Sequence, residues 1–113
     1  MIKTFIDLFS GAGGLALGME RAGFKNIFSI DFDNDSCETY RKNFPKHRLL
    51  NEDITELTEQ RIKDLIKNED IDCIVGGPPC QGFSMAGNIG RKFIEDPRNH
   101  LFKEFLRVVK IVK

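Results

Sequence analysis

Cys80 is the residue of this chain best suited to covalent chemistry. It lies in the segment Gly76-Gly77-Pro78-Pro79-Cys80-Gln81-Gly82-Phe83-Ser84, directly after the apolar run Ile71-Asp72-Cys73-Ile74-Val75. A thiol that follows a buried strand, in a turn without bulky neighbours, is placed to meet a substrate rather than to fill a core. The thiolate is the attacking species, and an unperturbed thiol has a pKa of about 8.5. We therefore predict that Cys80 is a nucleophile toward an electrophile that another group activates.

The other cysteines and the histidines do not extend this chemistry. Cys37 and Cys73 fall on predicted apolar faces and read as small core residues. His47 and His100 are remote from Cys80 in the sequence, which gives little support to a protease-like pair of cysteine and histidine. An odd number of cysteines without metal-ligand spacing favours a reducing compartment and argues against a zinc site.

A glycine turn near the N-terminus predicts a nucleotide-type ligand. Gly11, Gly13 and Ala16 fit the G-x-G-x-x-G/A pattern after a predicted strand, and Asp31 lies twenty residues beyond the first glycine. Glycines allow close approach of the backbone, and the acid can accept hydrogen bonds from ribose hydroxyls. By itself the motif fits a nicotinamide dinucleotide, S-adenosylmethionine or a purely structural turn.

Two further residues have both a functional and a structural interpretation. Phe32 could stack on an adenine, although an aromatic ring more often belongs to the core. Asp53 could accept from an adenine amino group, although an aspartate before a helix is more often an N-cap.

The elements that position these residues alternate between strand and helix. Strands are expected at Thr4–Phe9, Asn26–Ile30, weakly at His47–Leu50, and at Asp72–Val75. Helical patterns lie between them and again from Leu101 to Val112, whereas residues 82–97 read as a loop. Alternation of this kind predicts an α/β fold with a doubly wound, mainly parallel sheet. The glycine turn, Asp31, Asp53 and Cys80 then all fall at carboxyl ends of strands, where such sheets bind ligands.

The composition is that of one soluble domain. The chain has 113 residues, of which 41% are hydrophobic and 30% charged, with a formal net charge of zero. It has no apolar run of membrane-spanning length and no signal-peptide layout, so we expect a cytoplasmic protein. The half from residue 80 onward is basic, which suits either a polyanion or a solvated helix face. The apolar helical stripe at the C-terminus suggests a cut fragment or one subunit of a split protein.

Five segments in this order resemble the N-terminal motifs of cytosine-5 DNA methyltransferases. They are Phe5-Ile6-Asp7-Leu8-Phe9-Ser10-Gly11-Ala12-Gly13-Gly14, Asp31-Phe32-Asp33, Glu52-Asp53-Ile54, Pro78-Pro79-Cys80-Gln81-Gly82-Phe83-Ser84 and Glu95-Asp96-Pro97-Arg98-Asn99-His100-Leu101-Phe102. The resemblance covers nearly the whole chain and favours S-adenosylmethionine as the cofactor, with S-adenosylhomocysteine as product. It implies that residues 1–113 form the N-terminal portion of a methyltransferase catalytic domain of the S-adenosylmethionine-dependent type.

Carried over position by position, the resemblance implies a cofactor pocket, a nucleophile and nucleic-acid contacts. Asp31 would hold the ribose, where many family members have Glu; Phe32 would stack on the adenine, and Cys80 would attack carbon 6 of a flipped cytosine. The implied cofactor-binding residues are Phe9, Gly11, Gly13, Gly14, Asp31, Phe32, Asp53, Ile54, Gly77, Pro79 and Leu101. The implied contacts to double-stranded DNA are Gln81, Ser84 and Arg98, whereas Arg91 and Lys92 read better as surface charges.

The resemblance also indicates what this chain lacks. The family's Glu-Asn-Val motif, a later arginine motif, the target-recognition region and the segment that completes the cofactor pocket do not occur in it. We therefore expect the chain alone to be inactive and to need the missing part, possibly on a second polypeptide. Two alternatives stay open: a cytosine-5 tRNA methyltransferase, and a non-catalytic subunit or truncated remnant.

Overall fold

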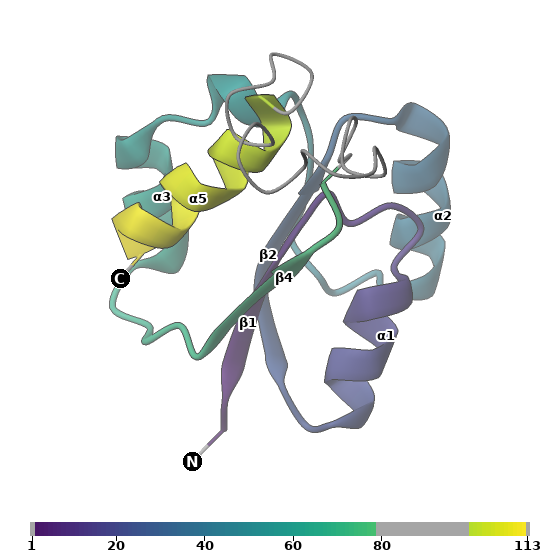
Figure 1. Ribbon diagram of the computed structural model, residues 1–113. Coiled ribbons are helices and arrows are strands. Elements are labelled where there is room, and N and C mark those ends of the chain that lie inside the picture. Colours follow the sequence, from purple (N-terminus) through teal and green to yellow (C-terminus); the bar gives the residue numbers. More distant parts are fainter. Residues whose placement is uncertain (1, 79–99, 113) are drawn as a thin grey trace, which may run out of the picture.

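The computed structural model describes residues 2–78 and 100–112 as a parallel sheet covered by helices on both faces (Figure 1). The elements in chain order are β1 (Thr4–Leu8), α1 (Gly14–Arg21), β2 (Lys25–Asp31), α2 (Asn34–Asn43), β3 (Leu49–Asn51), the short 3₁₀ helix η1 (Ile54–Glu56), α3 (Glu59–Ile66), β4 (Cys73–Gly76) and α5 (His100–Val112). The predicted α/β fold is thus confirmed. The weak third strand is also present, displaced toward Asn51. The loop predicted at 82–97 lies outside the described residues.

The strand order explains why helices lie on both faces. The sheet runs β3-β2-β1-β4, and all three pairings are parallel. The chain first moves outward from β1 to β3 and then returns to the other side of β1. Because crossovers between parallel strands are right-handed, this reversal moves the following helices to the opposite face. Figure 1 shows α1 and α2 on one face and α3 and α5 on the other.

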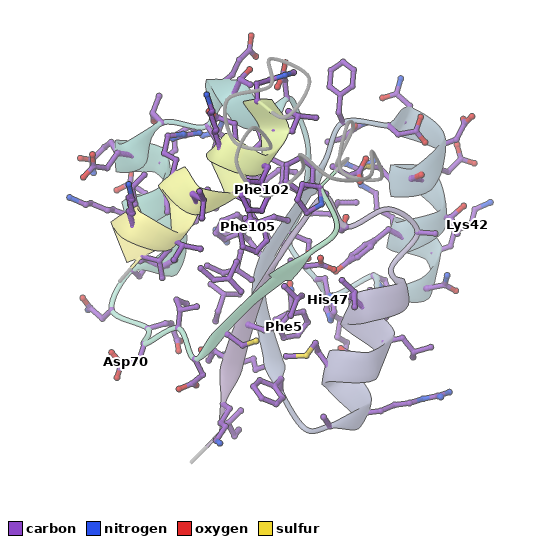
Figure 2. The ribbon with its side chains drawn as sticks, in the orientation of Figure 1. Phe5, Lys42, His47, Asp70, Phe102 and Phe105 are labelled. Carbon is purple, nitrogen blue, oxygen red and sulfur yellow. The ribbon has the colours of Figure 1, made fainter. Side chains whose placement is uncertain are left out.

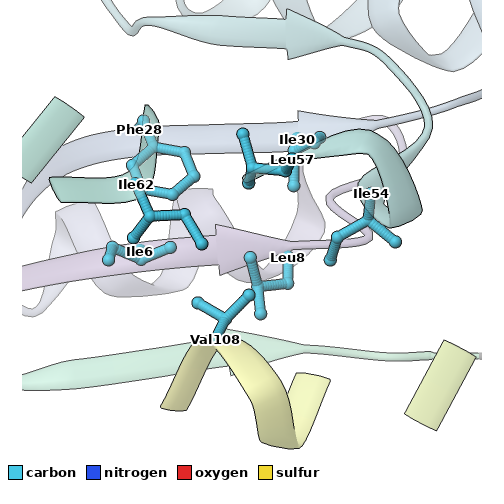
Figure 3. Close-up of a cluster of buried hydrophobic side chains, with 8 residues drawn as sticks. All are labelled: Ile6, Leu8, Phe28, Ile30, Ile54, Leu57, Ile62 and Val108. Atoms are coloured by element: carbon cyan, nitrogen blue, oxygen red, sulfur yellow. The ribbon is translucent and has the colours of Figure 1, made fainter. Parts of the chain in front are cut away.

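Each face of the sheet carries its own apolar core. On the α3 and α5 face, strand residues such as Ile6 and Ile30 pack against Ile62 and Val108 (Figure 3). On the α1 and α2 face, Phe5 packs with residues of the two helices, including Tyr40. Figure 2 shows Phe5 and Phe105 on opposite sides of the sheet. β1 is buried along its whole length and β2 is buried from Phe28 to Ile30, as is typical of parallel strands that helices cover on both faces.

Gly76 allows β4 to lie close to β1. A Cβ atom at this position would come within 2.2 Å of the carbonyl oxygen of Leu8, with which Gly76 is paired. Only glycine fits so close an approach of two backbones. The residue therefore fixes the carboxyl ends of β1 and β4 next to each other, at the point where the strand order reverses.

Candidate functional site

A cavity of about 410 Å³ opens at the carboxyl ends of the strands. Its walls come from the segments that follow β1, β2, β3 and β4 and from the first turn of α5. This is the edge at which ligands bind in doubly wound sheets. The described lining residues are Phe9, Ile30, Asp31, Phe32, Asp33, Glu52, Asp53, Ile54, Gly77, His100 and Leu101.

The cavity gathers seven of the residues that the sequence nominated for cofactor binding. They are Phe9, Asp31, Phe32, Asp53, Ile54, Gly77 and Leu101. Gly11, Gly13 and Gly14 do not line it but form the adjacent turn into α1. Pro79 lies outside the described residues, as do the predicted nucleophile Cys80 and the predicted nucleic-acid contacts Gln81, Ser84 and Arg98.

The glycine turn needs glycine for two reasons. Gly11 and Gly13 both have positive φ angles, +56° and +106°, which residues with a Cβ atom rarely adopt. At Gly13 a Cβ would also come within 2.6 Å of the ring of Phe44, the C-cap residue of α2. The turn is closed by a hydrogen bond from the Gly13 N–H to the Ser10 carbonyl, 3.1 Å long. These constraints bring the turn and the N-terminus of α1 close to the sheet edge.

Asp31 connects the glycine turn to the end of β2. Its Oδ2 accepts a hydrogen bond of 2.7 Å from the Gly11 N–H, and its Oδ1 accepts one of 2.8 Å from the Asp33 N–H. A carboxylate oxygen has further lone pairs, so both atoms can still accept from a ligand hydroxyl. Asp31 therefore orients the turn and also lines the cavity.

Asp53 is both an N-cap and a lining residue. It caps η1, and its Oδ1 accepts from the backbone N–H and the hydroxyl of Thr55 at 2.9 and 2.8 Å. The hydrogen bond from the Thr55 backbone N–H, and next that from the Thr55 hydroxyl, lower the pKa of Asp53. The side chain is thus ionised near neutrality and presents a negatively charged acceptor to the cavity. The two interpretations of this residue are therefore compatible.

Phe32 is not a core residue. Its side chain lines the cavity although the residue is 74% exposed. A large aromatic ring left in solvent at the rim of a cavity is available to stack on a flat ligand.

Ile30, Asp33, Glu52 and His100 also line the cavity and were not among the predicted site residues. The hydrogen bond from the Ser36 hydroxyl, and next that from the Ser36 backbone N–H, lower the pKa of Asp33. The hydrogen bond from the Arg61 guanidinium lowers the pKa of Glu52. Asp33, Glu52 and His100 each stand next to a predicted site residue in one of the quoted motifs, whereas Ile30 lies inside a predicted strand. The lining thus includes four carboxylates and, among the described residues, no lysine or arginine.

Asp7 is a buried acid on the strand that leads to the glycine turn. It is fully buried in β1, and neither carboxyl oxygen has a hydrogen-bond partner among the described residues. Burial, and next the negative charge of Asp31, raise the pKa of Asp7 from 3.8 to about 7. This carboxyl therefore titrates near neutrality.

Residues 2–78 and 100–112 contain neither a membrane-spanning helix nor a group of side chains suited to a metal ion. No helix there is long and apolar enough to cross a membrane. No three side chains of the types His, Cys, Asp and Glu are grouped there so that they could hold a metal ion.

Comparison with known sequences gives consistent relatives. A family model for C-5 cytosine-specific DNA methylases matches residues 3–113. Type II methyltransferase M1.HphI of Haemophilus parahaemolyticus is 55% identical over the whole chain, which covers 30% of that protein. Type II methyltransferase M.AquIA of Picosynechococcus is 45% identical over 97% of the chain, which covers 44% of that relative. The chain thus spans less than half the length of these curated relatives.

Solved structures share the fold. A DNA modification methyltransferase encoded within an E. coli prophage superposes with a TM-score of 0.78 at 41% identity, over 97% of this chain and 29% of its own. A DNMT2 mutant of Spodoptera frugiperda superposes with a TM-score of 0.66 at 30% identity, over 95% of this chain and 31% of its own. The family match covers nearly all of this sequence, and the chain belongs to the C-5 cytosine-specific DNA methylase family.

Proposed function

We propose that residues 1–113 form the cofactor-binding, nucleophile-bearing portion of a DNA cytosine-5 methyltransferase that uses S-adenosylmethionine. The observation that carries the proposal is the acidic cavity at the carboxyl ends of the strands, with its seven predicted lining residues. The Type II methyltransferases among the relatives further support a role in restriction–modification.

The charge of the cavity favours S-adenosylmethionine over a nicotinamide dinucleotide. Four carboxylates face the cavity, and the pKa values of Asp33, Glu52 and Asp53 are lowered. A dinucleotide would bring two pyrophosphate charges to this lining, and repulsion between like charges would oppose its binding. S-adenosylmethionine carries a sulfonium and an ammonium against one carboxylate, so its net charge is positive. The acidic lining thus supports the cationic ligand, a choice that the glycine motif alone leaves open.

The lining also suits the parts of an adenosine. The exposed ring of Phe32 would stack on the adenine, and Asp53 with Ile54 would meet the adenine edge. Asp31 would accept from the ribose hydroxyls while its hydrogen bond to the Gly11 N–H holds the turn in place. The ligand would supply an electrophilic methyl group.

The chain's own contribution to catalysis would be the Cys80 thiolate. Its sulfur would add to carbon 6 of cytosine, which moves electron density to carbon 5 and makes that carbon nucleophilic toward the methyl group. Loss of the carbon 5 proton and departure of the thiolate would then restore the ring. A base within a duplex cannot reach such a thiol, so the cytosine would be flipped out. Gln81, Ser84 and Arg98 would contact the DNA.

We propose that the remainder of the domain pairs with β4, whether on the same or on a second polypeptide. β4 is the outermost strand next to β1, and all four of its residues are only partly buried. Its sequence Cys-Ile-Val-Gly has no charge or proline to protect the edge. Strands of parallel sheets are normally covered, and an apolar edge attracts a further strand. The chain alone is therefore expected to bind the cofactor without transferring methyl groups.

A covalent-trapping experiment tests the proposed reaction. The chain, completed by a family polypeptide that carries the absent motifs, is incubated with S-adenosylmethionine and DNA containing 5-fluorocytosine. Fluorine cannot leave carbon 5 as a proton does, so a covalent protein–DNA adduct should accumulate on a denaturing gel. Cys80→Ser should abolish the adduct, and the matched control Cys73→Ser should keep it. An adduct that survives Cys80→Ser would exclude the assigned nucleophile.

The same preparation distinguishes the two alternatives. Methyl transfer to tRNA but not to DNA would replace the DNA assignment with a cytosine-5 tRNA methyltransferase. Absence of transfer to both nucleic acids, with the completing polypeptide present, would favour a non-catalytic subunit or remnant.

A further inference from the structure

Arg107 of α5 makes a bidentate contact with the backbone of η1. Its Nη1 donates to the Leu57 carbonyl at 2.8 Å, and its Nη2 donates to the Ile54 carbonyl at 2.9 Å. Its Nε donates to Glu104 at 2.9 Å, one turn earlier on the same helix. The Arg107 side chain is 32% exposed and that of Glu104 is 21% exposed, so the group is partly shielded from water. The planar guanidinium is thereby held in one orientation by three partners.

The two carbonyls belong to a segment with little stability of its own. η1 is a single 3₁₀ turn of three residues, in which the Ile54 carbonyl accepts one backbone hydrogen bond, of 3.1 Å, from the Leu57 N–H. So short a helix has few backbone hydrogen bonds, and the carbonyls at its C-terminal end need partners from outside it. A cation at the C-terminal end of a helix satisfies such carbonyls and interacts favourably with the helix dipole. Asp53 caps the N-terminus of the turn, and Arg107 supplies the corresponding contact at its C-terminus through the carbonyl of the C-cap residue Leu57.

Arg107 also connects two walls of the cavity. Asp53 and Ile54 form one wall, and Leu101 at the start of α5 forms another. Figure 3 shows apolar packing at the same junction, where Val108 of α5 meets the cluster that contains Ile54 and Leu57. Apolar packing is not directional, whereas a bidentate guanidinium contact fixes both distance and orientation. The guanidinium contact thus connects the wall that contains Ile54 to α5, the helix whose first turn contributes Leu101.

We propose that Arg107 is a positioning residue that sets the adenine-binding wall of the cavity. This inference rests on the proposed function, since it assigns the adenine edge to Asp53 and Ile54. Arg107 itself would not touch the ligand. It would act by holding the Ile54 carbonyl, and with it the backbone next to Asp53, at a fixed distance from α5.

The test compares two ligands that differ only at the adenine edge. The full 113-residue chain is titrated with S-adenosylhomocysteine and with S-inosylhomocysteine, in which a carbonyl replaces the adenine amino group. The dissociation constant of S-inosylhomocysteine divided by that of S-adenosylhomocysteine measures how strongly the site recognises the adenine edge. In Arg107→Ala this ratio should fall roughly tenfold. A change of that size corresponds to the loss of about one charge-assisted hydrogen bond. Arg107→Lys, with one ammonium in place of a fork, should give an intermediate ratio.

Matched variants separate positioning from loss of stability. Ile62→Val removes one buried methyl group from the same core and should lower the melting temperature without changing the ratio. Glu104→Gln leaves both contacts from Arg107 to the carbonyls in place and should also keep the ratio. Circular dichroism verifies that each variant is folded at the titration temperature. If Arg107→Ala does not fold, the comparison is made between wild type and Arg107→Lys.

Failure of this inference and failure of the proposed function look different. A wild-type chain that binds neither ligand would overturn the proposed cofactor site. A wild-type chain that prefers S-adenosylhomocysteine, with the same preference in the folded Arg107 variants, would refute only the positioning role.

Discussion

Replacement of Asp7 by asparagine should stabilise the chain above neutral pH and have little effect in mild acid. Asp7 is fully buried without a hydrogen-bond partner among the described residues, and its pKa in the folded chain is about 7, against an ordinary value of 3.8 for an aspartate in water. The folded state therefore holds this proton more tightly than the unfolded state does. Between those two pKa values the free energy of unfolding should fall as pH rises, because ionisation is easier after unfolding.

The size of the effect follows from the shift. A difference of about three pKa units corresponds to a loss of about 4 kcal/mol in the free energy of unfolding. The loss is complete above the folded-state pKa and absent below the unfolded-state pKa. Asparagine keeps the shape of the side chain and does not ionise. Its amide is also buried and polar, so its cost resembles that of the protonated acid. We expect wild type and Asp7→Asn to differ by less than about 1 kcal/mol near pH 4 and by about 2 to 4 kcal/mol near pH 8.

Urea denaturation at a series of pH values measures this difference directly. The midpoint and slope of each transition give the free energy of unfolding for wild type, Asp7→Asn and the exposed control Asp64→Asn. The control should show a nearly constant difference from wild type, since Asp64 is exposed. If the difference between wild type and Asp7→Asn does not change with pH, then Asp7 is solvated or paired in the folded chain, and the argument from burial fails.

Two substitutions test the packing that supports the cavity. Gly76→Ala should prevent stable folding or lower the melting temperature by more than about 10 °C, because a Cβ would lie 2.2 Å from the Leu8 carbonyl oxygen; a near-native melting curve would show that β4 can move away from β1. Tyr40→Phe should lower the free energy of unfolding by about 1 to 3 kcal/mol, because it removes the buried hydroxyl that bonds to Ser29 at 2.7 Å and to His47 at 2.8 Å; a change below about 0.5 kcal/mol by urea denaturation would mean that water replaces the hydroxyl.

The sheet was largely predictable because its strands carry strong local signals. β1 and β2 are rich in apolar residues that are buried on opposite faces, as is typical of parallel strands when helices cover both sides. β3 has only three partly buried residues, and its predicted range, His47–Leu50, began two residues early. η1 was not predicted because a single 3₁₀ turn has no apolar period. Its N-cap, Asp53, was the visible part of that element.

The candidate site was predictable only where a residue type indicates its own role. Asp31 ends β2, Phe32 follows it directly, and Asp53 comes two residues after β3, so topology alone brings them to one edge. His100 could not be assigned in this way, because its place in the wall depends on where α5 begins after the long segment between β4 and α5. The lack of a hydrogen-bond partner for Asp7 among the described residues could not be predicted either. An acid within an apolar run does not indicate whether a partner lies beside it in the fold.

The contacts that hold the cavity open are invisible in the sequence for a common reason. Asp31 to the Gly11 N–H joins residues twenty apart, and Arg107 to the Ile54 carbonyl joins residues fifty-three apart. Each contact pairs a charged side chain with a neutral backbone group. An ion pair can be guessed from two opposite charges in a sequence, but these contacts involve only one charged residue each. Both also fasten short irregular segments that lack the repeating hydrogen bonds of a helix or sheet. The regular elements therefore bring the walls together, whereas the charge-assisted backbone contacts set their spacing.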